Sequence, residues 1–307
     1  MLVSFNRSPK TGPWGGGSSF VSNMSNFLTE KGHDVIYSLT PDVDLIFMID
    51  PRPNDSGYSA SDIQRFKNYF PDVKVIHRIN ECDKRKNTDF IDEEIIKSNK
   101  VADETVFISK WLQSYFEDKG FCPGSYVSYN GVDSNIFYDH KRGTIKSKPR
   151  LVTHHWSDNW MKGFDIYKQI DQYLQSNDWF EFTYVGRYNS SYKPTRTKII
   201  EPLSGKALGD ELRNHDIYVT ASRFEPCGMH HIEGSACGLP ILFHADGGGI
   251  NELCKNHGIS FSSFEEFLKS FDAVIDDYSL YREKINYDSI SSAACCKRYY
   301  EIIEGMF

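Results

Sequence analysis

The segment EPCGMHHIE, residues 225–233, concentrates side chains that could take part in chemistry. Two carboxylates, Glu225 and Glu233, stand at its ends, with a cysteine and two histidines between them. Such groups could form a metal site, an acid–base pair or a cradle for a polar ligand. A zinc site made from the cysteine and the histidines would lack a fourth ligand and the usual spacing. The way in which the chain presents the two carboxylates therefore decides among these uses.

Pro226 and Gly228 determine that presentation, because neither residue suits the interior of a helix. We expect a helix to begin near Met229, with Glu225 on the loop that leaves the strand DIYVTAS and Glu233 in the first turns of the helix. Backbone N–H groups at a helix start bind phosphate, and a carboxylate accepts hydrogen bonds from a diol. A phosphorylated polyol would use all of these groups, whereas a metal would leave several unused.

His230 and His231 need no role in chemistry, because they can also be explained as packed or capping residues of that helix. Cys227 is explained as a small space-filling side chain, since no dedicated base partner is evident for it.

A second candidate element is the glycine-rich segment GPWGGGSSF at residues 12–20. It lies between a predicted strand and a predicted helix, where backbone N–H groups and the helix dipole favour an anion. The segment matches neither the dinucleotide fingerprint nor the P-loop. A simple strand-to-helix loop is the alternative interpretation.

Strand-like apolar runs alternate with helical stretches in both halves of the chain. Strands are predicted at 1–5, 34–39, 44–50, 73–79, 104–109, 125–131, 151–156, 180–186, 216–222 and 240–245. Helices are predicted at 18–31, 59–70, 90–101, 110–118, 163–176, 205–215, 229–237, 262–275 and 291–307. This alternation predicts an α/β protein with two Rossmann-like, doubly wound parallel-sheet domains that face a cleft. Ligands of such sheets bind at the carboxyl ends of the strands.

The polar segment YDHKRGTIKSKPR at 138–150 is typical of a linker between domains. We therefore expect an N-terminal domain at 1–140, a C-terminal domain at 141–290 and a final helix at 291–307.

Charge and cysteine content narrow the class of protein. A formal net charge of −7 gives no basic field for a nucleic acid. The seven cysteines are odd in number and include no C-x-x-C pair, which is typical of free thiols in a reducing compartment. No apolar run approaches the ~20 residues that a transmembrane helix needs. We expect a soluble, cytoplasmic protein without a nucleic-acid partner or a transmembrane segment.

The two glutamates stand in an E-x7-E arrangement that resembles the retaining nucleotide-sugar glycosyltransferases of the GT-B fold, specifically family 4 (glycosyl transferases group 1). The surrounding segment NHDIYVTASRFEPCGMHHIEGSACGLPILFHADGGGINEL is similar to that family's strand, glutamate motif, A-x-G-L-P strand entry and G-G-x-x-E loop. The segments GPWGGGSSF, GHDV and YNGVDSNIF also resemble family motifs. The resemblance spans nearly the whole chain.

The resemblance implies a metal-independent hexosyltransferase that retains anomeric configuration and needs no cofactor. It would move a hexose from a nucleotide-sugar donor, UDP- or GDP-linked, to an acceptor hydroxyl by a front-face mechanism. The C-terminal domain would bind the donor and the N-terminal domain the acceptor, and the final helix would cross back onto the N-terminal domain. The acceptor, a glycan, a lipid or a small molecule, is left open, with the loops at 50–59 and 80–89 shaping its site.

Site residues follow from the same resemblance. Glu233 would bind the donor's ribose, and Glu225 would hold hydroxyls of the transferred sugar. Backbone N–H groups near Gly228 and Met229 would support the donor, as would Gly248 in the second glycine run.

The remaining roles fall in both halves of the chain. Gly15 and Gly16 would approach the diphosphate or the acceptor. His77, at the end of its strand, would lie near the donor sugar, and Lys162 would bind the diphosphate.

One position departs from the family pattern, because the arginine that usually precedes the lysine is absent from THHWSDNWMKG. Loss of a guanidinium at a leaving diphosphate could cost a few kcal/mol of transition-state stabilisation. Arg187, or a protonated His154 or His155, could supply the charge. The departure keeps a non-catalytic sugar-nucleotide-binding protein as an alternative. A two-carboxylate glycoside hydrolase is a further one.

Overall fold

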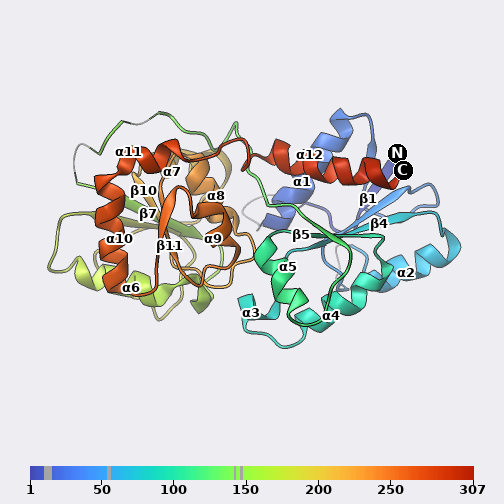
Figure 1. Ribbon diagram of the computed structural model, residues 1–307, viewed down its shortest axis with the longest axis horizontal. Helices are drawn as coiled ribbons and strands as arrows, with labels where there is room; N and C mark the ends of the chain where they lie inside the picture. The colour runs from blue at the N-terminus through green and yellow to red at the C-terminus, as the bar shows by residue number, and fades with distance from the viewer. Residues whose placement is uncertain (10–15, 54–56, 142, 146–147) are drawn as a thin grey trace. The chain divides into compact units, whose positions relative to one another are not determined.

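A computed structural model gives the fold of the chain (Figure 1). It describes residues 1–9, 16–53, 57–141, 143–145 and 148–307. The chain divides into two compact units, Met1–Asn130 together with Ser292–Phe307, and Gly131–Ser291. The chain therefore passes from the first unit to the second between Asn130 and Gly131. The domain boundary expected from the composition of the sequence is at residue 140.

The first unit contains a six-stranded parallel sheet with the strand order β2-β1-β3-β4-β5-β6. Its strands are β1 (Leu2–Phe5), β2 (Asp34–Ile36), β3 (Leu45–Met48), β4 (Lys74–Ile79), β5 (Glu104–Phe107) and β6 (Ser125–Val127). Its helices are α1 (Gly16–Glu30), α2 (Ala60–Tyr69), α3 (Asp83–Lys86), α4 (Ile91–Ser98), η1 (Asn99–Val101), α5 (Lys110–Glu117) and α12 (Ser292–Met306).

Both faces of this sheet are buried, which explains why the central strand β3 reads as a continuous apolar run. Leu45 and Phe47 pack into one cluster with α1 and α12. Ile46 packs into a second cluster with α2. The final helix α12 lies beside α1 (Figure 1), where the ring of Tyr299 is 4.8 Å from that of Phe20.

The second unit contains another six-stranded parallel sheet, in the order β12-β11-β10-β7-β8-β9. Its strands are β7 (Arg150–His155), β8 (Glu181–Gly186), β9 (Lys198–Ile200), β10 (Ile217–Thr220), β11 (Ile241–His244) and β12 (Gly258–Phe261). Its helices are η2 (Trp160–Lys162), α6 (Phe164–Tyr173), α7 (Gly205–Arg213), α8 (Met229–Ala236), α9 (Gly249–Cys254), α10 (Phe264–Asp276) and α11 (Tyr278–Glu283).

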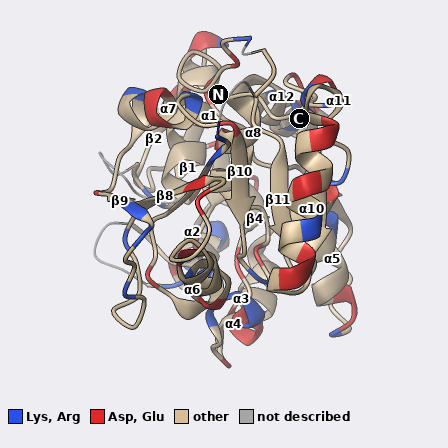
Figure 2. Ribbon diagram, turned by 90° about the vertical axis from the view of Figure 1, so that its left-hand side faces the viewer, with Lys and Arg blue, Asp and Glu red and all other residues tan. Residues whose placement is uncertain are grey.

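Helix α10 shows how the hydrophobic pattern builds this unit. Phe267 and Phe271 are fully buried in the aromatic core. Glu265, Lys269 and Asp272 face solvent on the same helix. In Figure 2, acidic positions predominate along α10, whose sequence has one lysine and no arginine. The apolar residues of α10 therefore recur with the helical period and form its buried side.

The predicted fold class is confirmed, since each unit has a parallel six-stranded sheet with connecting helices. The sequence prediction missed the strands β9 and β12 and the short helices α3, η2, α9 and α11. Both missed strands are short and lie at the edges of their sheet, where fewer apolar residues are needed. Among the described residues, no helix has both the length and the apolar character to span a membrane.

Candidate functional site

The carboxyl edge of the second sheet gathers an ion pair from two loops. Strand β10 leads into the loop that carries Glu225, and η2, which follows β7, ends at Lys162. The Lys162 Nζ lies 2.5 Å from Glu225 Oε2. Both side chains are largely buried, with 12% and 4% of their surfaces exposed. The two groups therefore form a largely buried ion pair.

The second glutamate is held separately, by a histidine at the end of β7. His154 Nε2 lies 2.7 Å from Glu233 Oε2. Glu233 lies in the second turn of α8, which begins at Met229 as the sequence predicts. The two carboxylates of the E-x7-E arrangement are therefore each paired with a nitrogen group of a residue distant in sequence.

Backbone contacts with the second glycine run fix the position of Glu225. Its N–H donates to Gly247 O at 3.2 Å, and its carbonyl accepts from Gly249 N at 2.9 Å. Gly248 has a positive φ of 71°, and a Cβ there would lie 2.8 Å from Glu225 O. The preceding residue, Phe224, also has a positive φ, 53°. Such strained backbone at a non-glycine residue costs about 1–3 kcal/mol and is common at functional sites.

Gly228 brings the start of α8 close to Glu225. It is the N-cap of the helix, and no side chain caps it within the described residues. A Cβ at Gly228 would lie 2.8 Å from Glu225 Cγ and 2.5 Å from His230 Cε1. A glycine is therefore required for this packing. The helix start beside the Lys162–Glu225 pair is suited to an anionic group of a ligand.

Three of the histidines around this site, His155, His230 and His231, are buried and neutral. Burial lowers the pKa of His155 and His230 well below the ordinary value, and it lowers that of His231 to about 3. The hypothesis that a protonated His155 replaces the missing arginine is therefore wrong, because desolvation disfavours its charged form. His230 donates to or accepts from Thr220 Oγ1 at 3.0 Å, as expected for a packed residue.

Arg187 lies at the same edge of the sheet. Its N–H donates to His155 O at 3.1 Å, and its carbonyl accepts from Tyr184 Oη at 2.7 Å. The residue is exposed, and its side chain makes no ion pair within the described part of the chain. The backbone contacts thus place a solvent-accessible guanidinium beside the end of β7.

The sequence prediction overlooked Arg223, two positions before Glu225. Its guanidinium donates two hydrogen bonds to Asp165, at 2.9 and 2.6 Å. Its N–H donates to Met161 O at 3.0 Å, which ties the glutamate loop to the segment that carries Lys162. The presence of an arginine in the loop that carries Glu225 could have drawn attention to this residue. Its acidic partner could not be identified, because Asp165 is distant from it in the sequence.

In the first unit, His77 lies near the end of β4 and is buried. Its Nδ1 is 2.7 Å from Asn99 Oδ1, which also accepts from Thr105 Oγ1 at 3.1 Å. Burial lowers the pKa of His77 to about 4, so its ring is neutral near pH 7. Because Nδ1 donates to the amide oxygen, Nε2 has a lone pair available for a hydroxyl donor.

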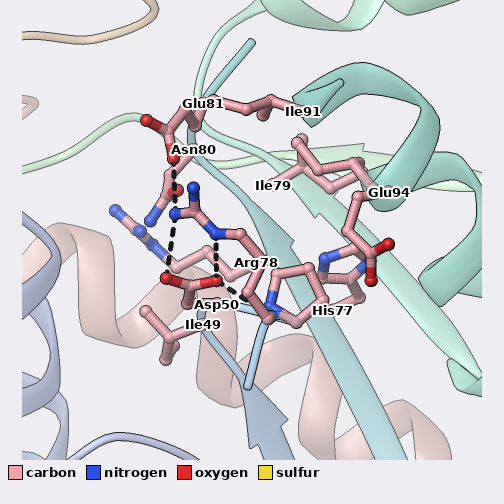
Figure 3. A pocket seen from close by; sticks show the side chains of 12 residues that line it. Ile49, Asp50, His77, Arg78, Ile79, Asn80, Glu81, Ile91 and Glu94 are labelled. Atoms are coloured by element: carbon pink, nitrogen blue, oxygen red, sulfur yellow. Dashed lines mark hydrogen bonds and ion pairs between the residues drawn. The ribbon is translucent and has the colours of Figure 1, made fainter. Parts of the chain in front are cut away.

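His77 lines a hollow in the first unit with an empty volume of about 300 Å³, open to solvent (Figure 3). Residues 50–52 and 80–81, from the two loops expected to shape the acceptor site, line this hollow. Arg52 donates to Asp50 at 2.8 and 2.9 Å and to Glu81 at 2.9 Å. The rest of the lining is Ile49, Pro51, Arg78, Ile79, Asn80, Ile91, Glu94 and Ile95. The hollow therefore offers paired charges beside an apolar wall.

Gly16 is the first residue of α1. Gly15 lies outside the described residues, so its predicted role has no structural counterpart here. No cluster of three or more His, Cys, Asp or Glu side chains suited to a metal ion occurs among the described residues.

Comparison with known proteins adds a family match for one segment and a fold for the chain. Residues 191–290 match the sequence model of the family Glycosyl transferases group 1. A probable sucrose-phosphate synthase of Thermosipho melanesiensis is 25% identical over 199 residues, which are 57% of this chain and 46% of that protein. The chain thus matches less than half the length of this curated relative.

Solved structures resemble the whole chain. HepE of Anabaena, in complex with UDP and glucose, has a TM-score of 0.72 at 14% identity, with 99% of each chain covered. The sucrose-phosphate synthase of Thermosynechococcus elongatus has a TM-score of 0.72 at 13% identity, covering 100% of this chain and 98% of that one. The fold is therefore that of the GT-B glycosyltransferases, and the matched segment supports the glycosyltransferase family.

Proposed function

We propose that this chain is a retaining hexosyltransferase that moves a hexose from a UDP- or GDP-linked donor to an acceptor hydroxyl. The observation that carries the proposal is the pairing of Lys162 with Glu225 beside the uncapped start of α8. This arrangement offers a cation and backbone N–H groups to a diphosphate and a fixed carboxylate to sugar hydroxyls. Structures of HepE with UDP and with UDP-glucose support a nucleotide-sugar donor.

In this proposal the second unit holds the donor. Glu233 accepts hydrogen bonds from the ribose, and Glu225 accepts them from hydroxyls of the transferred sugar. Lys162, with the N–H groups at Gly228 and Met229, binds the diphosphate. Gly248 keeps the Glu225 backbone in place, because a side chain there would strike its carbonyl.

The acceptor approaches from the first unit. His77 accepts a hydrogen bond from a sugar hydroxyl through Nε2, since its other ring nitrogen donates to Asn99. The hollow with Asp50, Arg52 and Glu81 is the proposed acceptor side, and Gly16 at the start of α1 contributes backbone N–H groups.

The reaction exchanges one bond at the anomeric carbon for another on the same face. The bond from this carbon to the diphosphate oxygen breaks, and its electron pair leaves with the diphosphate. The acceptor oxygen forms the new bond, and its proton passes to the departing diphosphate oxygen. The protein supplies positioning and charge stabilisation, and neither a metal nor another cofactor takes part in this scheme.

Arg187 is the proposed replacement for the arginine missing from the family pattern. It is exposed at the carboxyl edge of the second sheet, whereas Arg223 is already engaged with Asp165. A guanidinium that is not committed to a carboxylate can bind an incoming diphosphate without first breaking an ion pair.

The Lys162–Glu225 pair does not suit Glu225 to the role of general acid in a glycoside hydrolase. The general acid of such an enzyme must keep its proton near neutral pH, usually through an apolar environment. Glu225 instead forms an ion pair with the ammonium group of Lys162.

The experiment that tests the proposal measures release of nucleoside diphosphate from UDP-glucose, GDP-mannose and related donors, with and without a panel of acceptor sugars. We expect one donor to be turned over with retention of anomeric configuration, as seen by NMR of the product. Saturable donor binding with no diphosphate release for any acceptor would instead favour the non-catalytic binding protein. Turnover of simple glycosides without a nucleotide would favour the hydrolase.

A further inference from the structure

A hydrogen-bonded chain joins β10, β7 and α8 at the carboxyl edge of the second sheet. Tyr218 Oη lies 3.1 Å from His154 Nδ1, and His154 Nε2 lies 2.7 Å from Glu233 Oε2. Tyr218 and His154 are buried, whereas the Glu233 side chain keeps 15% of its surface exposed. The chain therefore begins in the core and ends at a carboxylate that a ligand can reach.

The direction of both hydrogen bonds follows from the groups involved. Burial raises the pKa of Tyr218 well above its ordinary value, so the phenol keeps its proton and can donate it to His154 Nδ1. The imidazole then carries its hydrogen on Nε2 and donates to Glu233, because an ionised carboxylate only accepts. The opposite tautomer would place a ring lone pair against the carboxylate. In this arrangement His154 presents an N–H at Nε2 to Glu233.

Packing keeps the chain of hydrogen bonds in place. The backbone N–H of His154 donates to Tyr218 Oη at 3.1 Å, so the hydroxyl is fixed from the β7 side. On the other side, a Cβ at Gly234 would lie only 2.6 Å from Tyr218 Cδ2. The glycine next to Glu233 therefore lets α8 lie directly on the tyrosine ring. Without this approach, Glu233 would not meet His154.

We propose that His154 is a positioning residue for Glu233 and thereby sets the selectivity of the site for a nucleotide with an intact ribose diol. This role rests on the proposed function, in which Glu233 binds the ribose. His154 holds one carboxylate oxygen, and the other, Oε1, makes no hydrogen bond within the described residues. A carboxylate fixed in this way accepts from the 2′- and 3′-hydroxyls without having to be ordered by the ligand.

Two replacements separate this role from simple packing. In a His154→Gln variant the amide nitrogen takes the place of Nε2 and still reaches Glu233. In a His154→Asn variant the amide nitrogen takes the place of Nδ1 and falls short of the carboxylate. A Tyr218→Phe variant keeps the ring against Gly234 and removes only the hydroxyl that contacts His154 Nδ1.

The experiment is titration calorimetry with UDP and 2′-deoxy-UDP, and with GDP and 2′-deoxy-GDP as a second pair. Wild type is expected to prefer the ribonucleotide by about 10- to 100-fold, the value of a hydrogen bond to a charged group. His154→Asn should reduce this ratio to nearly one, His154→Gln should retain most of it, and Tyr218→Phe should lower it partly. Thermal unfolding of each variant shows that it is folded.

His215→Asn is the matched control. His215 is also a buried histidine of the second unit, but it precedes the amino end of β10, and its Nδ1 contacts Glu211 O at 2.9 Å. This variant should keep the wild-type ratio. An unchanged ratio in His154→Asn or in Tyr218→Phe, or an equal loss in His154→Gln and His154→Asn, would overturn the role of His154 alone. Failure of the wild type to bind any of the nucleotides would overturn the proposed function and this role together.

Discussion

Replacing Lys162 with methionine probes how the site holds its buried charges. The change removes an ammonium group from a carboxylate whose side chain is only 4% exposed. Removing one partner of a buried ion pair costs about 3–5 kcal/mol. Because Lys162 keeps 12% of its own surface in solvent, we expect the lower end of that range. A domain of this size loses about 2–4 °C of Tm per kcal/mol, so Tm should fall by about 6–12 °C.

The double variant Lys162→Met/Glu225→Gln identifies the origin of that loss. With both charges gone, no unpaired carboxylate is left in the interior, so most of the stability should return. Turnover should be lost in the single and the double variants alike, because the diphosphate and the sugar hydroxyls lose their partners. The assay is thermal unfolding by circular dichroism for the wild type, both single variants and the double variant, together with release of nucleoside diphosphate.

Lys168→Met is the control, because Lys168 is an exposed lysine of α6. A surface change of this kind is expected to alter stability by no more than about 0.5 kcal/mol. The reasoning is refuted if Lys162→Met is as stable as Lys168→Met, or if the double variant is no more stable than Lys162→Met.

Three further predictions concern the backbone, the diphosphate and pH. In Gly248→Ala, a positive φ of 71° is combined with a Cβ that would lie 2.8 Å from the Glu225 carbonyl oxygen. The free energy of unfolding in urea should therefore fall by about 1–3 kcal/mol, and turnover should decrease. Wild-type stability and turnover in this variant would contradict the prediction. Arg187→Ala should weaken donor binding and turnover by about 10- to 100-fold. The control is Arg196→Ala, because Arg196 is an exposed arginine on the same connection between β8 and β9, and this variant should behave as wild type. Intact turnover in Arg187→Ala would mean that the guanidinium that replaces the missing arginine lies elsewhere. Burial lowers the pKa of His77 to about 4, so the unfolded chain binds protons more readily, and stability should fall as pH drops from about 6.5 towards 4. Urea unfolding of wild type and His77→Gln at about pH 7.5 and about pH 5 checks this, and an equal pH dependence in both proteins would exclude a contribution from His77.

Local sequence patterns were sufficient to predict the helix and strand ends that carry the site residues. Pro226 and Gly228 exclude a continuous helix from Glu225, and α8 does begin at Met229. His77 was expected near a strand end because its strand is a continuous apolar run, and β4 ends at Ile79. In each case the information lies within a few residues of the feature, so spacing and propensity could provide it.

Partners that are distant in the sequence could not be identified in this way. Arg223 pairs with Asp165 across 58 positions, and Arg52 meets Glu81 across 29. The hypothesis that a protonated His155 serves as the missing cation is wrong because it, too, depends on residues distant in the sequence. Its pKa depends on burial beneath surrounding elements, and the sequence around it gives no measure of that burial.

The sequence by itself determined the α/β alternation, the two parallel sheets and the position of Glu225 on a loop before a helix. These features follow from hydrophobic period and from the conformational limits of proline and glycine, which act over short distances. Only the tertiary structure decided that Lys162 contacts Glu225 across 63 positions and that His154 contacts Glu233 across 79. Packing of β7, β10 and α8 fixes those contacts, because the energy of burying and pairing a charged group depends on what surrounds it in space.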